Sequence, residues 1–491
     1  MKSSSRFFYP GLYRVKIKKE RGKKVLFSSI PFLYYFLPVV LIAYFISPGK
    51  IKNTVLLISS LIFYGWGEPK YVFLMAATIF FGYVFGILTE KYRQTDTKKS
   101  KTFMIISVVI SLSFLIYFKY TDFFIGAFAS ATKLPLKLLN IALPVGISFY
   151  TFQIISYNID VYRGEKAQKN IINLACYVTM FPQLIAGPIV RYSDIALQLQ
   201  KREHSFSKVG EGITRFIIGF SKKILLANQL GEICDAYRGT DERSVLFVWL
   251  YAVAYCLHIY FDFSGYSDMA IGLGKILGFD FMENFNYPFI SKSITEFWRR
   301  WHMSLGTWFR DYVYIPLGGN RVSVKRHCFN IFVVWFLTGF WHGANWNFML
   351  WGLYFAVLLT VEKFFLLKLL KKNRVFAHTL VLFLIMISFI IFDSMSMSAI
   401  ISSVGGLFGA GGIPAVNAES IYLLKSYLPL LVIGIIGATP LMRDTVKKLS
   451  ENSRTKIIVS VIEPVFVSVL LIVITAYLVD GSFNPFLYFR F

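Results

Sequence analysis

Residues 25–47 read VLFSSIPFLYYFLPVVLIAYFIS and contain no charged side chain. A run of this length crosses the hydrocarbon layer of a membrane as one helix, which takes about 20 apolar residues. Further apolar stretches recur along the rest of the chain, at 51–66, 71–88, 103–119, 140–157, 170–190, 245–261, 329–341, 345–367, 376–402, 420–441 and 457–479. The sequence therefore predicts an all-α polytopic membrane protein.

The composition of the 491-residue chain supports this prediction. Only 16% of the residues are charged, whereas soluble domains average about 25%. The mean hydropathy is +0.56. These values exclude a disordered chain, a fibrous repeat and a small disulfide scaffold. The cysteines form no close pair, so neither a disulfide framework nor a zinc site is predicted; they are Cys176, Cys234, Cys256 and Cys328.

The charge is strongly positive, with 52 Lys and Arg against 27 Asp and Glu. Many basic residues lie in the extension 1–24, and others cluster between apolar runs at 91–101, 201–223, 363–374 and 443–456. Such loops are typical of cytoplasmic segments beside anionic lipid headgroups. No basic stripe interleaved with aromatics lies in a polar domain, so nucleic acid is not an expected partner. We expect membrane lipids as partners, and a cytoplasmic extension before a single membrane domain at 25–491.

Several apolar runs are short or interrupted. The run 51–66 ends at a Gly-Glu-Pro sequence, and the run 140–157 contains a proline and a glycine. Such breaks predict tilted, broken or re-entrant segments. If the first three runs all span, the basic loop 90–101 falls outside, so either one run is re-entrant or the charge rule fails there. The polar stretch 191–244 predicts amphipathic helices at the membrane interface.

Ionisable side chains inside membrane-rich sequence are functional candidates, because burying them is costly. They gather in residues 294–312. Taken as a helix, this segment places Glu296 four residues before Arg300, at ion-pairing spacing. Its three tryptophans and its arginines also fit a helix that lies at headgroup depth, which is the simpler interpretation of this segment alone.

His342 ends the apolar run 329–341 and precedes a glycine. A histidine at the end of an apolar helix is usually structural, but its side chain suits proton transfer near neutral pH. His302 lies on the other side of the same run, so one histidine can deprotonate an attacking hydroxyl while the other orients it or stabilises charge. The pair predicts a buried acyl-transfer centre, with supporting residues chosen by their closeness in sequence: Arg299, Asp311, Trp341 and Asn345.

Other catalytic signatures are absent from the sequence. It contains no Gly-x-Ser-x-Gly elbow, no Walker loop and no His-Glu-x-x-His, and Gly272-x-Gly274 lacks the third glycine of a dinucleotide-binding turn. No metal is expected. Of the remaining histidines, His258 is predicted to be structural, whereas the other three are predicted at the surface: His204, His327 and His378.

Three stretches carry a family resemblance: YFDFSGYSDMAIG at 260–272, FWRRWHMSLGTWFRDYVYIPLGGNR at 297–321 and WHGANW at 341–346. They are similar to motifs of the membrane-bound O-acyltransferase (MBOAT) family, and within it to the branch of the alginate O-acetyltransferase membrane subunit. Further stretches agree in the same order: LPVGISFYTFQ at 143–153, VYRG at 161–164, MFPQLIAGPIVR at 180–191 and PFLYFRF at 485–491. The resemblance begins near residue 26, so the extension 1–24 has no assigned role.

The resemblance implies an MBOAT-like ring of about ten to twelve transmembrane helices, with re-entrant or interfacial helices, around a central funnel or tunnel. The catalytic core would span about 143–346, with His342 matching the catalytic histidine and His302 the second one. It also implies that acetyl-CoA in the cytoplasm donates an acetyl group, which crosses a bacterial inner (cytoplasmic) membrane. An extracytoplasmic partner resembling SGNH hydrolases would then acetylate an extracellular or cell-wall polysaccharide.

Two alternatives stay open at this point. A D-alanyl transfer protein of teichoic acid modification resembles the same family and takes its acyl group from a carrier protein; the IPLGGNR segment at 315–321 favours the acetylating branch instead. A transporter or flippase without chemistry would also carry broken helices and buried charges. The WHG sequence at 341–343 and the lack of a visible inverted repeat weigh against it.

Overall fold

Every regular element of the described chain is a helix. The computed structural model describes residues 27–480 and Phe486, and no strand occurs among them. The extension 1–24 and all of the motif 485–491 except Phe486 lie outside the described residues, so the predictions made for them stay predictions.

Within the described part of the chain, six helices are long and apolar enough to cross a membrane. They are α3 with the turn before it (Pro69–Tyr92), α4 (Thr97–Thr132), α11 (Val245–Ile276), α17 (Arg374–Asp393), α19 (Ala418–Gly437) and α21 (Ser453–Val479). This confirms the predicted all-α multi-pass architecture.

The other helices are shorter or less apolar. The larger ones are α2 (Lys52–Gly67), α5 (Ile147–Arg163), α9 (Phe206–Ser221), α10 (Asn228–Gly239), α14 (Val324–His342) and α15 (Trp346–Val361). The smaller ones are α1 (Leu37–Ile46), α6 (Ile171–Thr179), α7 (Phe181–Leu184), α8 (Tyr192–Gln200), α12 (Ile294–Arg300), α13 (Met303–Phe309), α16 (Leu367–Lys372), α18 (Met397–Gly406) and α20 (Leu441–Glu451). Four π-helical turns, Pro31–Phe36, Lys222–Ala227, Arg310–Tyr314 and Glu362–Leu366, and three 3₁₀ turns, Gly49–Ile51, Pro69–Tyr71 and Pro288–Ile290, complete the described elements.

The predicted interruption of the run 140–157 is confirmed. Residues 133–146 are not helical, and α5 begins only at Ile147. Gly146 precedes it with φ +77°, a conformation that glycine adopts without steric cost. A Cβ at this position would also approach the Leu184 carbonyl oxygen to 2.8 Å, so only glycine fits here.

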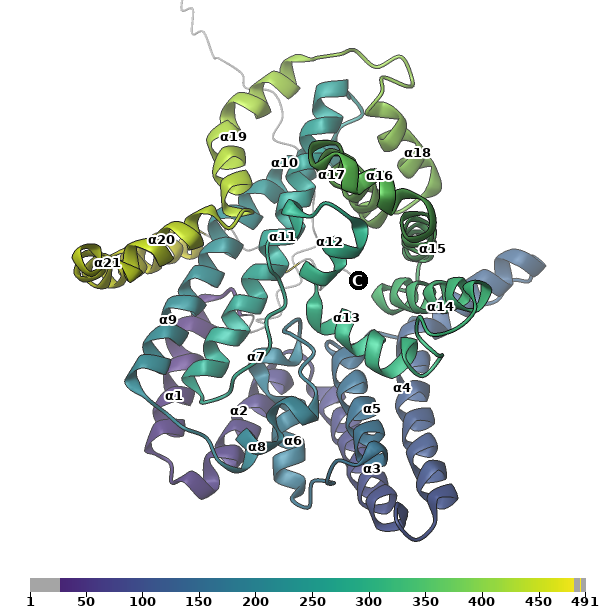
Figure 1. Cartoon of the computed structure of the whole chain (residues 1–491), viewed down its shortest axis with the longest axis vertical. Helices are drawn as coiled ribbons and strands as arrows, with labels where there is room; N and C mark the ends of the chain where they lie inside the picture. Colours follow the sequence, from purple (N-terminus) through teal and green to yellow (C-terminus); the bar gives the residue numbers. More distant parts are fainter. Residues whose placement is uncertain (1–26, 481–485, 487–491) are drawn as a thin grey trace, which may run out of the picture.

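α11 runs through the middle of the molecule, with α9 and α10 along one side (Figure 1). Small residues let α9 and α11 approach closely. A Cβ on Gly212 would lie 2.7 Å from the Gly272 carbonyl oxygen, and one on Gly219 would lie 2.6 Å from the Gly265 carbonyl oxygen. Glycine at such crossings allows backbone contact between membrane helices, so Gly272 serves helix packing.

Two large hydrophobic clusters meet at α11. One contains the N-terminal helices and the C-terminal half of α11, and the other contains its N-terminal half with α10, α15 and α17. A smaller aromatic cluster of buried side chains includes Phe152, Trp308 and Trp341. The two histidines lie where these clusters approach one another.

The prediction of a single helix over 294–312 is wrong. The chain forms α12, breaks at Trp301 and His302, and resumes as α13 and a π-helical turn. Two of the three tryptophans of this segment lie in the protein interior, since Trp301 and Trp308 are each only 5% exposed. The predicted helices of 191–244 are present, but α9 and α10 pack along α11, and Lys223 between them is fully buried.

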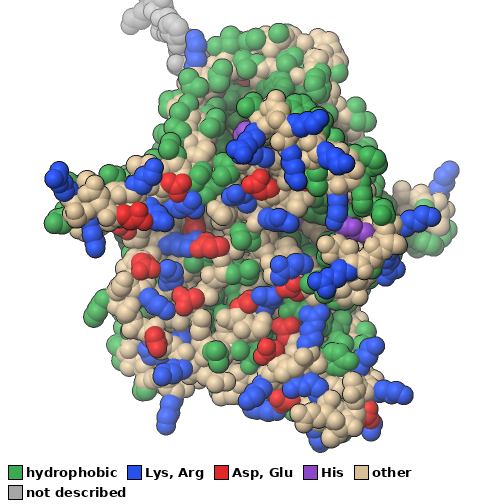
Figure 2. Space-filling view, viewed as in Figure 1, with side chains coloured by type: hydrophobic (Ala, Val, Ile, Leu, Met, Phe, Trp, Pro, Cys, Tyr) green, Lys and Arg blue, Asp and Glu red, His purple; other side chains and the backbone are tan. Residues whose placement is uncertain are grey.

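Charged side chains cover much of the face seen in Figure 2, where Lys and Arg outnumber Asp and Glu. α20 and α21 project from one side of the bundle (Figure 1). α20 has no buried residue, and α21 buries only Val467 and Ile474. These two helices therefore add little to the protein core.

Candidate active site

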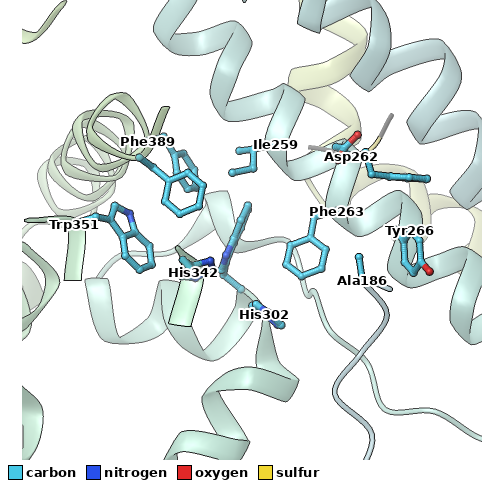
Figure 3. A pocket seen from close by; sticks show the side chains of 12 residues that line it. Ala186, Ile259, Asp262, Phe263, Tyr266, His302, His342, Trp351 and Phe389 are labelled. Carbon is cyan, nitrogen blue, oxygen red and sulfur yellow. The ribbon is translucent and has the colours of Figure 1, made fainter. Parts of the chain in front are cut away.

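A cavity of about 50 Å³ lies between α11, α14, α15 and α17 and has both histidines on its wall. This volume is several times what one water molecule needs. In Figure 3, His342 and His302 are neighbours between Trp351 on one side and Phe263 on the other. The rest of the wall is mostly aromatic; it consists of Ala186, Ile259, Asp262, Tyr266, Trp301, Phe389, Phe392 and Phe486.

His342 is the last residue of α14. The helix begins after Ser323, whose hydroxyl accepts from the Arg326 backbone N–H, and it ends because Gly343 is extended. The imidazole stands edge-on to Trp351 and Phe392, with ring centroids 5.1 and 5.2 Å away. It is half-buried, so it borders the cavity and is not sealed in the core.

Two side chains of α4 hold the end of α14. Lys119 Nζ donates to the carbonyl oxygens of Trp341 at 2.5 Å and His342 at 3.3 Å, and the Tyr120 hydroxyl donates to the Phe340 carbonyl at 2.6 Å. The last carbonyls of a helix lack intrahelical partners, and a cation there also complements the helix dipole. Sequence reasoning missed Lys119, although a lysine inside an apolar run is itself a signal.

His302 occupies the break between α12 and α13. Its φ is +46°, in the left-handed region, and its side chain is only 2% exposed. The side chain of Asn284 lies opposite, with Oδ1 3.1 Å from His302 Nδ1. Nε2 is buried and has no hydrogen-bond partner among the described residues. Burial lowers the pKa of His302 to about 3, so the imidazole is neutral at physiological pH.

A buried carboxylate fixes the other end of α12. Glu362 is 1% exposed and accepts from the backbone N–H groups of Ile294 and Thr295 and from the Thr295 hydroxyl. An anion at a helix N-terminus satisfies free N–H groups and complements the helix dipole. Glu362 thus holds the short helix that leads to His302.

α14 and α15 are in backbone contact near His342. A Cβ added to Gly339 would overlap the Phe348 carbonyl oxygen, and one added to Gly352 would overlap the Trp335 carbonyl oxygen. Only glycine permits this approach. The separation of these two helices therefore sets where His342 lies relative to Trp351.

Of the four predicted supporting residues, the structure places only Trp341 beside the histidines. Its ring centroid is 6.1 Å from that of His302 and 5.0 Å from that of His342. Arg299 is exposed, and Asn345 is exposed and accepts from the Trp346 N–H at the start of α15. The predicted ion pair between Glu296 and Arg300 is present at 3.0 Å.

Asp311 lies in a different, polar pocket of about 360 Å³. There it forms an ion pair with Arg191 at 2.8 Å. The same pocket contains Asp160, whose carboxylate accepts from the Tyr312 hydroxyl at 2.8 Å and whose pKa is raised by burial. A stack of Phe152 on Trp308, 3.8 Å between ring centroids, lies between this pocket and Trp341.

The remaining histidines and the cysteines lie outside the cavity wall. His258 is buried with Nδ1 2.5 Å from the Ala227 carbonyl oxygen, as expected for a structural residue. His204 is exposed and His378 half-buried, but the surface prediction for His327 is wrong, since it is 5% exposed and contacts Tyr314. All four cysteines are free, and the described residues hold no group of three His, Cys, Asp or Glu side chains that fits a metal ion.

Comparison with known proteins shows which family this chain belongs to. Residues 134–402 match the model of MBOAT, the membrane-bound O-acyltransferase family. The chain is 42% identical over 393 residues to the protein named "Probable alginate O-acetylase AlgI" of Azotobacter vinelandii, covering 79% of each chain. It is 32% identical over 428 residues to the "Peptidoglycan O-acetyltransferase" of Helicobacter pylori, covering 79% of this chain and 81% of that one.

A third relative matches a smaller part of the chain. It is 34% identical over 239 residues to the "Teichoic acid D-alanyltransferase" of Bacillus subtilis, covering 45% of this chain and 59% of that one. The family model spans more than half of the chain and includes both histidines of the cavity. With its multi-pass helical fold, the chain therefore belongs to the membrane-bound O-acyltransferase family, and it is an O-acyltransferase.

Proposed function

We propose that this enzyme transfers an acetyl group for the O-acetylation of an extracellular or cell-wall polysaccharide. The observation that carries the proposal is the pair of histidines, His302 and His342, on the wall of one small aromatic cavity. Two relatives that each match 79% of the chain are named as O-acetylating enzymes, one for alginate and one for peptidoglycan. Their names support a polysaccharide acceptor for this chain.

The two histidines are proposed to act on one acyl group, with His342 as the base and His302 assisting. A hydroxyl oxygen of the acceptor attacks the thioester carbonyl, and His342 removes the hydroxyl proton as the new C–O bond forms. When the C–S bond breaks, the imidazolium returns that proton to the leaving sulfur. One C–O bond replaces one C–S bond and one proton moves from oxygen to sulfur, so this reaction needs neither a metal nor a redox partner. His302 assists from the same wall, and Trp341 packs against both rings.

Acetyl-CoA is the proposed donor. The small size of the cavity, about 50 Å³, suits a short acyl group better than the body of coenzyme A. The nucleotide part would therefore stay outside the cavity, and only the thioester end would reach His342. The basic loops of the chain favour a cytoplasmic donor side, and we place the enzyme in the bacterial inner membrane.

An extracytoplasmic partner resembling SGNH hydrolases is proposed to receive the acetyl group and pass it to the polymer. D-alanyl transfer to teichoic acid is the second candidate, because one relative carries that name. That match covers 45% of the chain, against 79% for the O-acetylating relatives. The family membership disfavours a transporter or flippase without chemistry.

The test is acetyl transfer from radiolabelled acetyl-CoA to cell-envelope polymer in membranes that contain the wild type, His342→Ala or His302→Ala. We expect His342→Ala to lose about 10³-fold, within the range that a positioned general base contributes. His204→Gln is the matched control, because this exposed histidine lies outside the cavity wall. Wild-type rates in a well-expressed His342→Ala variant would overturn the proposal. Transfer only from a D-alanyl carrier protein would select the second candidate.

A further inference from the structure

We propose that Asn284 is a positioning residue for His302: it fixes the imidazole tautomer so that Nδ1 carries the proton and Nε2 presents a lone pair at the cavity wall. The inference rests on the proposed function, in which His302 assists acyl transfer. Asn284 lies in the segment between α11 and α12 and is fully buried. No motif reasoning singled it out.

The orientation of the Asn284 amide follows from its neighbours. The backbone N–H of Ser304 lies 3.2 Å from Oδ1 and can only donate, so that atom must be the amide oxygen. The Ser304 hydroxyl also donates to Oδ1, at 2.9 Å, and the amide nitrogen donates to the Ser267 hydroxyl at 3.0 Å. A flipped amide would set N–H against N–H, which leaves buried donors unpaired at a cost of about 1–3 kcal/mol.

The tautomer of His302 follows from that orientation. Nδ1 faces the amide oxygen at 3.1 Å and therefore must carry a hydrogen. The Ser304 hydroxyl oxygen also lies near Nδ1, at 3.4 Å. This hydroxyl donates its hydrogen to Asn284 Oδ1 and accepts from the Ile189 N–H, so it has no hydrogen left to donate to Nδ1. Both neighbours of Nδ1 are acceptors. In a neutral imidazole the second nitrogen is then an acceptor with no proton.

The same asparagine also holds the backbone around His302. The backbone carbonyl oxygen of Asn284 accepts from the Met303 N–H at 3.0 Å, and its side-chain oxygen accepts from the Ser304 N–H. Two successive N–H groups after His302 therefore bond to Asn284. These bonds hold the left-handed conformation of His302, which a histidine adopts only with support from its surroundings. Ring orientation and backbone position are thus set by one residue.

The consequence is a defined role for His302 in the cavity. Its Nε2 is buried and unpartnered among the described residues, and it can accept a proton or hydrogen bond but cannot donate one. His302 therefore serves as an acceptor for the hydrogen of a reacting group, and not as a donor to the oxyanion that develops on the thioester carbonyl. A donor role would need the opposite tautomer.

The test compares Asn284→Ala and Asn284→Asp in the full-length enzyme, with kcat, KM and the pH dependence of kcat as readouts. Alanine removes the acceptor, so kcat falls about 10²-fold while KM changes little. Aspartate keeps an acceptor at Oδ1, so kcat stays within about tenfold of the wild type. Asn330→Ala is the matched control, since Asn330 is equally buried and, within the described part of the chain, its amide donates to the Leu317 and Gly319 carbonyls, away from the cavity wall.

The pH dependence separates positioning from mere support of the fold. The carboxylate of Asn284→Asp would face Nδ1–H and favour the imidazolium, so the acid limb of the kcat profile moves to higher pH. The other titratable groups around His302 are the same in both variants: His342 of α14 and Asp262 and Tyr266 of α11 line the same cavity, and Lys119 of α4 donates to the Trp341 carbonyl oxygen.

Two results would overturn the inference. One is a folded Asn284→Ala enzyme with wild-type kcat. The other is an Asn284→Asp enzyme as slow as the alanine variant or with an unmoved acid limb; this comparison also decides the matter if the alanine variant does not fold. Failure of the proposed function itself is a different result, in which the wild type transfers no acetyl group.

Discussion

Lys119 Nζ of α4 lies 2.5 Å from the carbonyl oxygen of Trp341, the residue before His342. The two positions are far apart in sequence, and the contact joins a membrane-spanning helix to the last turn of α14. A cation placed at the free carbonyls of a helix end stabilises that end by about 0.3–2 kcal/mol. The bond therefore ties the candidate catalytic histidine to α4.

We expect Lys119→Met to lower kcat about tenfold, because the last turn of α14 loses its charged anchor and His342 loses its fixed position. Lys119→Arg keeps a donor and a positive charge, so it should recover part of the rate. The kcat values are measured as steady-state acetyl transfer per folded enzyme for the wild type and both variants. Equal kcat for the methionine variant and the wild type would show that Lys119 does not position His342.

Contact between α14 and α15 gives a second prediction. Gly339→Ala or Gly352→Ala places a methyl group against a carbonyl oxygen of the other helix, so the pair must move apart. Overpacking of this kind costs about 1–3 kcal/mol, and we expect a lower Tm together with reduced acyl transfer.

The control for this prediction is Gly210→Ala. Gly210 is an exposed glycine inside α9 whose added Cβ meets no atom within 4 Å. Alanine is the better helix former by about 1 kcal/mol, so this variant should be as stable as the wild type or slightly more. A Gly339→Ala protein that behaved like Gly210→Ala would contradict the close contact.

Asp160 gives a prediction about pH. Burial raises the pKa of the Asp160 carboxyl in the folded protein, whereas the pKa of an aspartate in an unfolded chain is about 3.9. The carboxyl therefore favours folding most at low pH, and that contribution is lost as the pH rises through its folded-state pKa. At neutral pH the buried carboxyl therefore favours folding less than it does at low pH.

We expect Asp160→Asn to raise Tm relative to the wild type at neutral pH, and to do so less at about pH 4.5. The amide can still accept the hydrogen bond from Tyr312. Thermal unfolding in one detergent at the two pH values measures the difference. A Tm difference that is independent of pH would argue against a raised pKa at this carboxyl.

Sequence patterns predicted the membrane fold well, because spanning length and hydropathy are local properties. The helices α11, α17, α19 and α21 all lie on apolar stretches visible in the sequence. The break before α5 was also predictable, since Pro144 and Gly146 interrupt the apolar run in the sequence. Chemistry and motifs also predicted that His302 and His342 belong together, and the structure places both on one cavity wall although they are forty positions apart in sequence.

The break at His302 could not be predicted in the same way. Residues 294–305 contain neither proline nor glycine, so local propensity favours one helix. Tertiary hydrogen bonds decide otherwise, because Asn284 takes the N–H groups of Met303 and Ser304. Asp311 was misplaced for a related reason: the turn Arg310–Tyr314 carries it to the polar pocket with Arg191. Closeness in sequence says little once the helix is broken.

The aromatic wall of the cavity has a consequence for the timing of entropy loss. Aromatic side chains such as Trp351 and Phe389 have only two rotatable side-chain bonds. Neighbouring rings hold them in place: the ring centroids of Trp351 and Phe392 are 5.4 Å apart, and those of Phe389 and Trp301 are 5.2 Å apart. Their rotational freedom is lost once, when the chain folds. Each acyl group then enters a space that is already shaped, so ordering the walls adds little to the barrier of a single turnover.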